Sequence, residues 1–372
     1  SMPYKTVFDA YHLYHLPQFD PVIDLLLNDN RFEVFLTTSS ANLPDEQNLT
    51  KHIFQRRNVQ CIFANNEEER AAKIRSLNPD VFICGWSRYP IEKFVTEKTL
   101  VGMIYHGIGV KPSYWRDNHP RLNIRFVEGP FRMRQLREKG IQTDLELTGF
   151  PKIDPLFNGQ IASREEILRN LGLDFNKKTL LYAPTFYPSS FESFGMKLPE
   201  MAKDLNLIIK LHQWSYFLEK FSGVNLRRHI KLANKIRKKY PRVVMIEPEH
   251  YNIIDLYQAS DILLTEASST IYEFMALRKH IIICDFFKKK IEHHLLPKRI
   301  YLHRLDPEMH GIMTEFCYHI KQPRDLPVAL NKCFQQPDPF VELREKYIAD
   351  MLYKLDGRAS ERIRNSILSR VN

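Results

Sequence analysis

Short apolar runs alternate with amphipathic segments along most of the chain, and this alternation is typical of an α/β protein. The runs at 81–85 and 100–105 are almost continuously apolar, as expected of parallel strands that helices cover on both faces. Between the runs, apolar residues recur at three- and four-residue spacings, which predicts helices. Strands are predicted at 6–10, 32–37, 59–63, 81–85, 100–105, 124–128 and 145–148, and helices around 21–27, 47–57, 67–77, 91–96 and 131–139.

The alternation breaks at residues 149–155, where one glycine and two prolines predict a linker. A second series follows, with strands predicted at 179–183, 207–211, 243–246, 262–265 and 281–285. A chain of 372 residues is also long for a single hydrophobic core. We therefore predict two Rossmann-like α/β domains, residues 1–152 and 153–340, which face a central cleft. Residues 341–372 are predicted to form C-terminal helices that pack back across the domains.

The net charge of the chain is +10, which suits a phosphate-rich ligand, a nucleic acid or an anionic membrane and does not choose among them. No signature of a nucleic-acid-binding module accompanies the charge, so we expect no nucleic-acid partner. The segment from Lys220 to Arg242 is rich in lysine and arginine and has no acidic residue. Two interpretations stay open: a solvated helix face, or a surface that docks on anionic lipid or a polyanionic product.

Cysteine usage and the familiar metal signatures exclude several classes of protein. The five cysteines lie far apart, without a CxxC pair, which indicates buried thiols in a reducing compartment and no zinc site. No HExxH motif or paired aspartate cluster points to another metal. There is no signal peptide and no apolar run long enough to span a bilayer. We therefore expect a cytoplasmic protein with no metal and no cofactor.

The stretch from Asp261 to Phe274 offers the clearest candidate for a phosphate site. Its apolar run at 262–264 predicts a buried strand, and the spacing after Thr270 predicts a helix. Ser268 or Ser269 is a good N-cap, and a helix start presents free N–H groups and the positive end of the helix dipole. Glu273, about one helical turn further on, can bind a ribose diol. The alternative is an ordinary capped helix with a surface glutamate.

Three further strand ends carry residues suited to chemistry. His106, followed by Gly107 and a second glycine, can face a cleft and remove a proton from a hydroxyl. Thr185 follows another strand and can donate to a phosphate. Alternation along a strand puts Lys210 and His212 on one face, where two cationic groups suit a pyrophosphate. Taken singly, each has a plain alternative: a structural histidine, a loop anchored by proline, and a solvent-facing edge strand.

No GxGxxG motif follows the first strand and no GxxxxGK[ST] motif occurs, so the common nucleotide-binding families are excluded. Six short segments, in this order, resemble the CDP-glycerol glycerophosphotransferase family of teichoic-acid primases and polymerases. They read HGIGVK at 106–111, GFPKID at 149–154, YAPT at 182–185, KLH at 210–212, TEASS at 265–269 and DGRASER at 356–362. The chain departs from the family pattern at Ile108 and Gly109, which replace Thr-Pro, at Gln213, which replaces proline, and at Glu266, which replaces aspartate.

The resemblance implies a GT-B fold and a donor that is CDP-glycerol or a similar CDP-alditol. It implies transfer of glycerol phosphate to an acceptor hydroxyl with release of CMP. His106 would be the general base, with Gly107 and Lys111 on the acceptor side. His212 would be the second catalytic residue: together with Lys210 it would stabilise the phosphate charge of the donor and of the transition state. Thr185, Ser268, Ser269 and Thr270 would bind the donor phosphates, and Glu273 would bind the ribose. Such phosphoryl transfer depends mostly on positioning and electrostatics, so protein cations can replace a metal.

The resemblance also implies an acceptor that is a lipid-linked or polymeric glycan at the inner face of the cell membrane. The basic segment from Lys220 to Arg242 would suit peripheral binding to that surface. Two other functions stay open. One is a GT-B glycosyltransferase that uses a sugar nucleotide in capsule or lipopolysaccharide synthesis. The other is a non-catalytic protein of the same fold that binds a polyanion.

Overall fold

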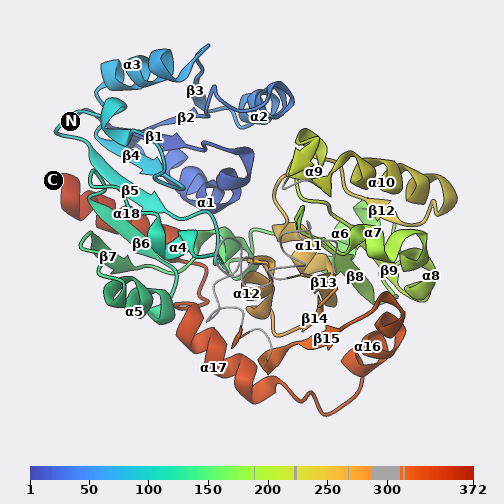
Figure 1. Ribbon diagram of the computed structural model, residues 1–372. Coiled ribbons are helices and arrows are strands. Elements are labelled where there is room, and N and C mark those ends of the chain that lie inside the picture. The colour runs from blue at the N-terminus through green and yellow to red at the C-terminus, as the bar shows by residue number, and fades with distance from the viewer. Residues whose placement is uncertain (110, 188, 222–223, 267, 287–310, 313–314) are drawn as a thin grey trace. The chain divides into compact units, whose positions relative to one another are not determined.

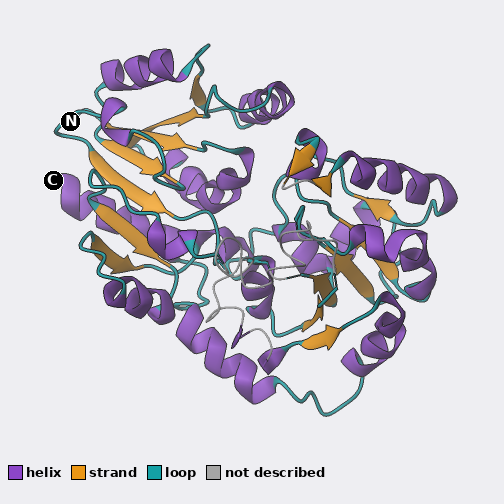
Figure 2. Cartoon of the chain, in the orientation of Figure 1, coloured by secondary structure: helices purple, strands orange, loops and turns teal. Residues whose placement is uncertain are grey.

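Two parallel β-sheets organise the chain in the computed structural model, which describes residues 1–109, 111–187, 189–221, 224–266, 268–286, 311–312 and 315–372 (Figure 1). Unit 1 comprises Ser1–Gly107, Ser113–Gln160 and Ala349–Asn372, and unit 2 comprises Ile108–Pro112 and Ile161–Ile348. Helices flank the strands of each sheet (Figure 2), so the predicted α/β fold class is confirmed. The expected domain boundary after Lys152 falls within η3 (Pro151–Leu156), inside unit 1.

The sheet of unit 1 has seven parallel strands in the order β3-β2-β1-β4-β5-β6-β7. Its strands are β1 (Tyr4–Asp9), β2 (Phe32–Thr37), β3 (Gln60–Ile62), β4 (Val81–Cys84), β5 (Leu100–Ile104), β6 (Ile124–Val127) and β7 (Asp144–Leu147). Each overlaps one of the strands predicted from the sequence. The strand order reverses between β1 and β4, and ligands of such sheets bind at the carboxyl ends of strands beside the reversal.

Helices of unit 1 begin and end where the sequence supplies caps. In α3 (Glu67–Leu77), the side chain of Asn66 accepts the Glu69 amide, and Asn78 ends the helix at a φ of 53°. α1 starts earlier than predicted because Pro17 is tolerated in its first turn. The other helical elements are η1 (Leu13–His15), α1 (Leu16–Leu27), α2 (Pro44–Arg56), η2 (Ile91–Lys93), α4 (Ser113–Arg116), α5 (Pro130–Glu138) and α18 (Ala359–Val371).

Two of the family-like segments meet in unit 1 and join the C-terminal helix to it. The buried carboxylate of Asp154 accepts the backbone amides of Ala359 at 3.1 Å and Ser360 at 2.8 Å, and so caps α18. Arg362 donates to the Thr148 carbonyl at 2.7 Å. α18 also packs against α1. The segments at 149–154 and 356–362 therefore have a structural role in unit 1.

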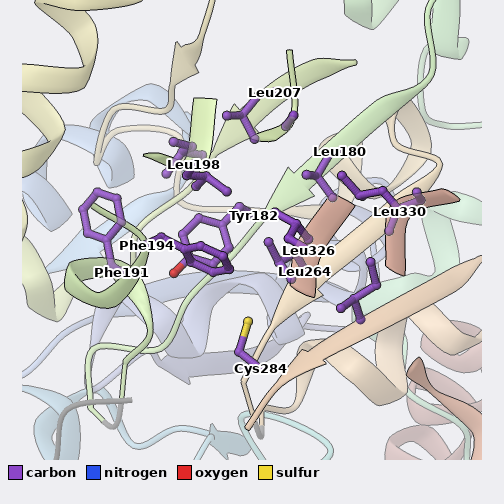
Figure 3. Close-up of a cluster of buried hydrophobic side chains, with 14 of the residues drawn as sticks. Leu180, Tyr182, Phe191, Phe194, Leu198, Leu207, Leu264, Cys284, Leu326 and Leu330 are labelled. Carbon is purple, nitrogen blue, oxygen red and sulfur yellow. The ribbon is translucent and has the colours of Figure 1, made fainter. Parts of the chain in front are cut away.

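The sheet of unit 2 has six parallel strands in the order β12-β9-β8-β13-β14-β15. Its strands are β8 (Thr179–Tyr182), β9 (Asn206–Ile209), β12 (Val244–Met245), β13 (Ile262–Thr265), β14 (His280–Cys284) and β15 (Tyr318–Ile320). The order reverses between β8 and β13, so Thr185 and Glu266, which follow them, lie at the expected ligand-binding edge. Figure 3 shows side chains of β8, β13 and β14 packed with those of neighbouring helices in the core.

The remaining elements of unit 2 are mostly short helices. They are α6 (Arg164–Asn170), α7 (Phe191–Phe194), η4 (Gly195–Lys197), α8 (Leu198–Met201), α9 (Trp214–Phe217), α10 (Arg227–Lys239), α11 (Ile254–Ala259), α12 (Thr270–Met275), η5 (Pro323–Asp325), α16 (Leu326–Cys333) and α17 (Val341–Met351), with the antiparallel pair β10 (Lys220–Phe221) and β11 (Val224–Asn225). α17 runs from unit 2 into unit 1 at residue 349. Among the described residues, no helix combines the length and apolarity needed to cross a bilayer.

Candidate active-site residues in the two units

His106 lies at the carboxyl edge of the unit 1 sheet, two residues after β5, and is partly exposed. Its backbone amide donates to the carbonyl of Gly85 at 3.1 Å, and its ring Nδ1 lies 2.9 Å from the same oxygen. A carbonyl oxygen can only accept, so Nδ1 carries the proton. In the neutral ring, Nε2 therefore carries the lone pair. This is the tautomer that a general base acting through Nε2 requires.

Aromatic rings surround His106. His15 stacks on it with ring centroids 4.6 Å apart, and Tyr105 lies at 4.3 Å. Tyr14 meets it edge-on at 5.3 Å. Gln18 donates to its carbonyl oxygen. Sequence reasoning missed His15, although the aromatic run after the first strand, at the reversal of strand order, was a signal that could have found it.

The two residues expected beside His106 on the acceptor side are assigned to different units. Gly107 is buried and belongs to unit 1, whereas Lys111 belongs to unit 2. The Lys111 ammonium lies 5.9 Å from the centroid of the Phe186 ring. Val110, within the same family-like segment, lies outside the described residues. A common acceptor-side role for Gly107 and Lys111 stays a prediction.

Lys210 and His212 follow β9 in unit 2. The prediction of a strand through residue 211 was wrong, because β9 ends at Ile209 and the chain turns into α9 at Trp214. The alternation of side chains along a strand therefore does not put Lys210 and His212 on one face. Lys210 is 9% exposed, and its amide donates to the Tyr182 carbonyl at 2.9 Å.

The His212 ring is held by its own turn. The backbone amide of Trp214 donates to His212 Nδ1 at 3.1 Å, so Nδ1 must be unprotonated. The proton of the neutral ring is then on Nε2. The ring packs against Phe186, with centroids 4.7 Å apart. His212 is thus arranged to donate a hydrogen bond through Nε2, as a ligand of phosphate oxygens would.

Glu266 ties the loop after β8 to the end of β13. Its buried carboxylate accepts the backbone amides of Thr185, at 2.9 Å, and Ser190. Burial raises the pKa of Glu266 to about 7, and the bonds from Ser190 and Thr185 oppose this rise. Thr185, a predicted donor ligand, is therefore positioned by the residue that replaces the family's aspartate.

The expected phosphate site at α12 differs in detail from the prediction. Ser269 occupies the N-cap position, but its side chain makes no capping bond. The hydroxyl of Ser268 instead accepts the amide of Thr270 at 3.2 Å and bonds its hydroxyl at 2.8 Å. The physical reason is the helical backbone of Ser269, with ψ at −24°, whereas a side-chain cap normally sits on an extended backbone. Ala267 lies outside the described residues.

Glu273 is fully buried, not a surface glutamate. The hydroxyl of Tyr257 donates to Glu273 Oε1 at 2.6 Å. A ribose diol can reach this carboxylate only if the packing around α12 opens. Its role as a ribose ligand stays a prediction, and its burial weighs against it.

The basic segment is centred on α10, one of the longer helices of unit 2. His229, Ala233 and Ile236 face inward, and the helix presents basic side chains outward. The exposed basic residues of this helix and its end are Arg227, Arg228, Lys231, Lys235, Arg237, Lys238, Lys239 and Arg242. Two are paired with acidic side chains, Arg227 with Glu219 and Arg237 with Glu247.

Among the described residues, no group of three or more His, Cys, Asp or Glu is placed to hold a metal ion.

Comparison with solved structures identifies the fold. The wall teichoic acid polymerase TagF superimposes with a TM-score of 0.68 at 15% identity, over 100% of this chain and 90% of that chain. A UDP-N-acetylglucosamine 2-epimerase structure from Neisseria meningitidis gives a TM-score of 0.57 at 16% identity, over 98% and 99% of the two chains. At these identities the likeness concerns the fold alone, which is the predicted GT-B type.

Curated relatives match by sequence. A teichoic acid poly(glycerol phosphate) polymerase of Bacillus spizizenii is 31% identical over 36% of this chain and 33% of its own length. A teichoic acid glycerol-phosphate transferase of Staphylococcus aureus is 21% identical over 85% and 82% of the two chains. The match spans about a third of the length of the first of these relatives. The model of the CDP-Glycerol:Poly(glycerophosphate) glycerophosphotransferase family matches residues 135–369, more than half of the chain, so the chain belongs to that family.

Proposed function

We propose that this chain transfers glycerol phosphate from CDP-glycerol to a hydroxyl group of a lipid-linked or polymeric cell-surface glycan, and releases CMP. The observation that carries the proposal is the pair of histidines within a chain of this family. His106 has the tautomer of a base, and His212 has the tautomer of a hydrogen-bond donor. One group accepts a proton and the other stabilises phosphate charge, which is what this reaction needs.

In the proposed reaction the acceptor hydroxyl oxygen attacks the phosphorus that carries the glycerol. Its proton passes to Nε2 of His106. The bond between that phosphorus and the bridging oxygen breaks, and the electron pair leaves with CMP. Lys210 and His212 balance the negative charge on the phosphate oxygens during transfer, with hydroxyls of Thr185 and of the 268–270 turn as further ligands.

Donor selection tests the proposal first. Calorimetry in EDTA compares CDP-glycerol and CDP-ribitol with UDP-, GDP- and dTDP-sugars. We expect binding of CDP-glycerol without a divalent metal, followed by CMP release when a glycan acceptor is supplied. Binding of a sugar nucleotide alone would replace the proposal with glycosyl transfer. Binding of CDP-glycerol without CMP release, over a range of glycan acceptors, would favour a non-catalytic binding protein.

The outward face of α10 supports a second part of the proposal, which is peripheral binding at the inner face of the cell membrane. Its exposed lysines and arginines attract anionic headgroups, by about 1 kcal/mol for each basic residue near the surface. The triple variant Lys231→Glu, Lys235→Glu, Lys238→Glu should lose binding to vesicles that contain phosphatidylglycerol. The matched control reverses the exposed Lys177, Lys178 and Lys332 and should still bind. Equal binding by both variants would remove α10 as the docking surface.

A further inference from the structure

His15 is a buried polar ring without hydrogen-bond partners in the part of the chain that the structure describes. It is the last residue of η1, its side chain is 0% exposed, and neither ring nitrogen has a hydrogen-bond partner there. Leaving a buried polar atom unpaired destabilises the folded state. Because the ring makes no hydrogen bond there, any role of His15 has to come from its shape and its ring contacts.

The ring of His15 is fixed between Gly85 and His106. A Cβ on Gly85 would lie 3.1 Å from the Cγ and Nδ1 atoms of His15, so a side chain there would force the ring to shift by a few tenths of an ångström. On its other side, His15 stacks on His106 with an interplanar angle of 17°. Gly85 therefore serves both rings: its missing side chain admits His15, and its carbonyl accepts from His106 Nδ1.

Neighbouring rings close the remaining sides of His15. Tyr14 meets it edge-on at 4.7 Å, Trp86 at 5.2 Å and His12 at 5.7 Å. Since these contacts leave little room for rotation, the plane of His15 sets the plane in which the His106 ring can lie.

The surroundings of His15 also keep its ring uncharged. Burial, followed by the nearby His106, His12 and Arg88, lowers the pKa of His15 well below 6.5. The ring is therefore neutral at neutral pH and does not place a second positive charge against His106 when His106 takes up a proton. His12 itself bonds Glu46 at 3.0 Å.

We propose that His15 is a positioning residue for His106: its flat ring holds the His106 ring in the plane that keeps Nδ1 on the Gly85 carbonyl and the lone pair on Nε2. The inference rests on the proposed role of His106 as the base. His15 contacts no reacting atom in this arrangement. The flat shape of the His15 ring positions His106, and its two nitrogens do not contribute.

The test compares His15→Ala, which removes the ring, with His15→Phe, which keeps a flat ring and removes the nitrogens. We expect His15→Ala to lower kcat on the order of tenfold, with donor KM unchanged, because the base is misplaced and the donor site is not. His15→Phe should recover most of that loss. His52→Gln, an exposed histidine on α2, serves as the control and should match the unmodified chain.

A spectroscopic measurement separates this inference from the proposed function, since it needs no substrate. In ¹⁵N-histidine-labelled protein, the His106 signal is assigned by its loss in His106→Gln. We expect one Nδ1–H tautomer in the unmodified chain and in His15→Phe, and a mixture in His15→Ala. Gly85→Ala, whose methyl group meets the His15 ring, provides a second perturbation with both histidines present and should also give a mixture.

Two results would overturn the inference. One is a folded His15→Ala, or Gly85→Ala if the former does not fold, with an unchanged His106 tautomer. The other is a His15→Phe variant that loses as much kcat as His15→Ala, since the nitrogens would then matter. If CDP-glycerol is not a substrate but the tautomer responds as expected, the proposed function fails and the positioning role stands.

Discussion

His106 and His212 each follow a buried strand at the carboxyl edge of a parallel sheet, and a backbone group fixes Nδ1 of each ring. In unit 1 that group is the Gly85 carbonyl, which accepts, and in unit 2 it is the Trp214 amide, which donates. The same side chain therefore offers a lone pair at Nε2 in one unit and an N–H at Nε2 in the other. The local backbone, more than the residue type, decides what each histidine can do.

The surroundings of the two rings differ in the same sense. His106 lies among aromatic rings, stacked on the neutral His15. His212 follows Lys210 along the chain and packs against Phe186. A ring packed among aromatic rings suits a base, whereas a histidine two residues after a lysine suits a site that binds phosphate charge.

Replacing each histidine by glutamine gives the largest expected difference between the two sites. The glutamine amide can donate a hydrogen bond but cannot take up a proton near neutral pH. His106→Gln should therefore lower kcat by about 10²–10⁴, the range for loss of a general base, with CDP-glycerol binding retained. His212→Gln should keep kcat within roughly tenfold, because the amide replaces the Nε2–H donor.

His212→Phe completes this comparison. It keeps a ring against Phe186 and removes the donor, so we expect a kcat loss of about 10²–10³, as for removal of one donor to transition-state charge. Rates of CMP release and calorimetric donor affinities measure both sets of variants. Equal losses for glutamine at the two positions would mean that the tautomers do not assign the roles.

The titration of Glu266 should have an effect of intermediate size, on the stability of unit 2. Its folded pKa of about 7 lies above the ordinary glutamate value of 4.5, so the folded state binds more protons between these pH values. Stability from this group is complete below about pH 4.5 and is lost as the pH rises through about 7. The loss amounts to roughly 3 kcal/mol.

Glu266→Gln removes this titration. The unfolding free energy of the unmodified chain should fall relative to the variant, by roughly 3 kcal/mol, between about pH 4.5 and about pH 8. Urea unfolding at a series of pH values measures the difference. Glu249→Gln, which changes an exposed glutamate of unit 2, is the control and should show no comparable slope. A parallel pH dependence for the chain and Glu266→Gln would show that folding does not raise the pKa of Glu266.

Sequence patterns predicted the sheets well because their strands are continuous apolar runs. Every strand predicted for unit 1 is present, and β13 is found at the predicted residues. The sequence did not predict β15. The strand has only three residues, two of them partly exposed, which is too short for an alternating pattern to show. Sequence also identified His106, Lys210 and His212 as candidates. It could not give their tautomers, which depend on a carbonyl 21 residues away and on the local turn at Trp214.

Burial was harder to predict than position. Glu273 and Glu266 look like ordinary polar residues in sequence, yet both are fully buried, because Tyr257 and the loop after β8 fold over them. His15 was not among the candidates that the sequence suggested. Such roles depend on partners that are distant in sequence, and a single sequence does not contain that information.

The smallest expected effect tests whether unit 1 can be weakened without changing the His212 site. Asp154→Ala leaves the amides of Ala359 and Ser360 without their acceptor at the start of α18. Loss of such a cap should lower the unfolding free energy of unit 1 by about 1–2 kcal/mol. Asp356→Ala, which removes an exposed partner of Arg362, should cost at most about 1 kcal/mol.

Denaturant unfolding followed by hydrogen exchange resolves the two units separately. We expect Asp154→Ala to shift exchange protection in unit 1, including α18 and α1, and to leave the strands of unit 2 unchanged. CDP-glycerol affinity should stay constant, because the proposed donor ligands lie in unit 2. If the variant lowers donor affinity or the protection of unit 2, the two units are energetically coupled. The surroundings of His106 and of His212 could then no longer be treated as independent of one another.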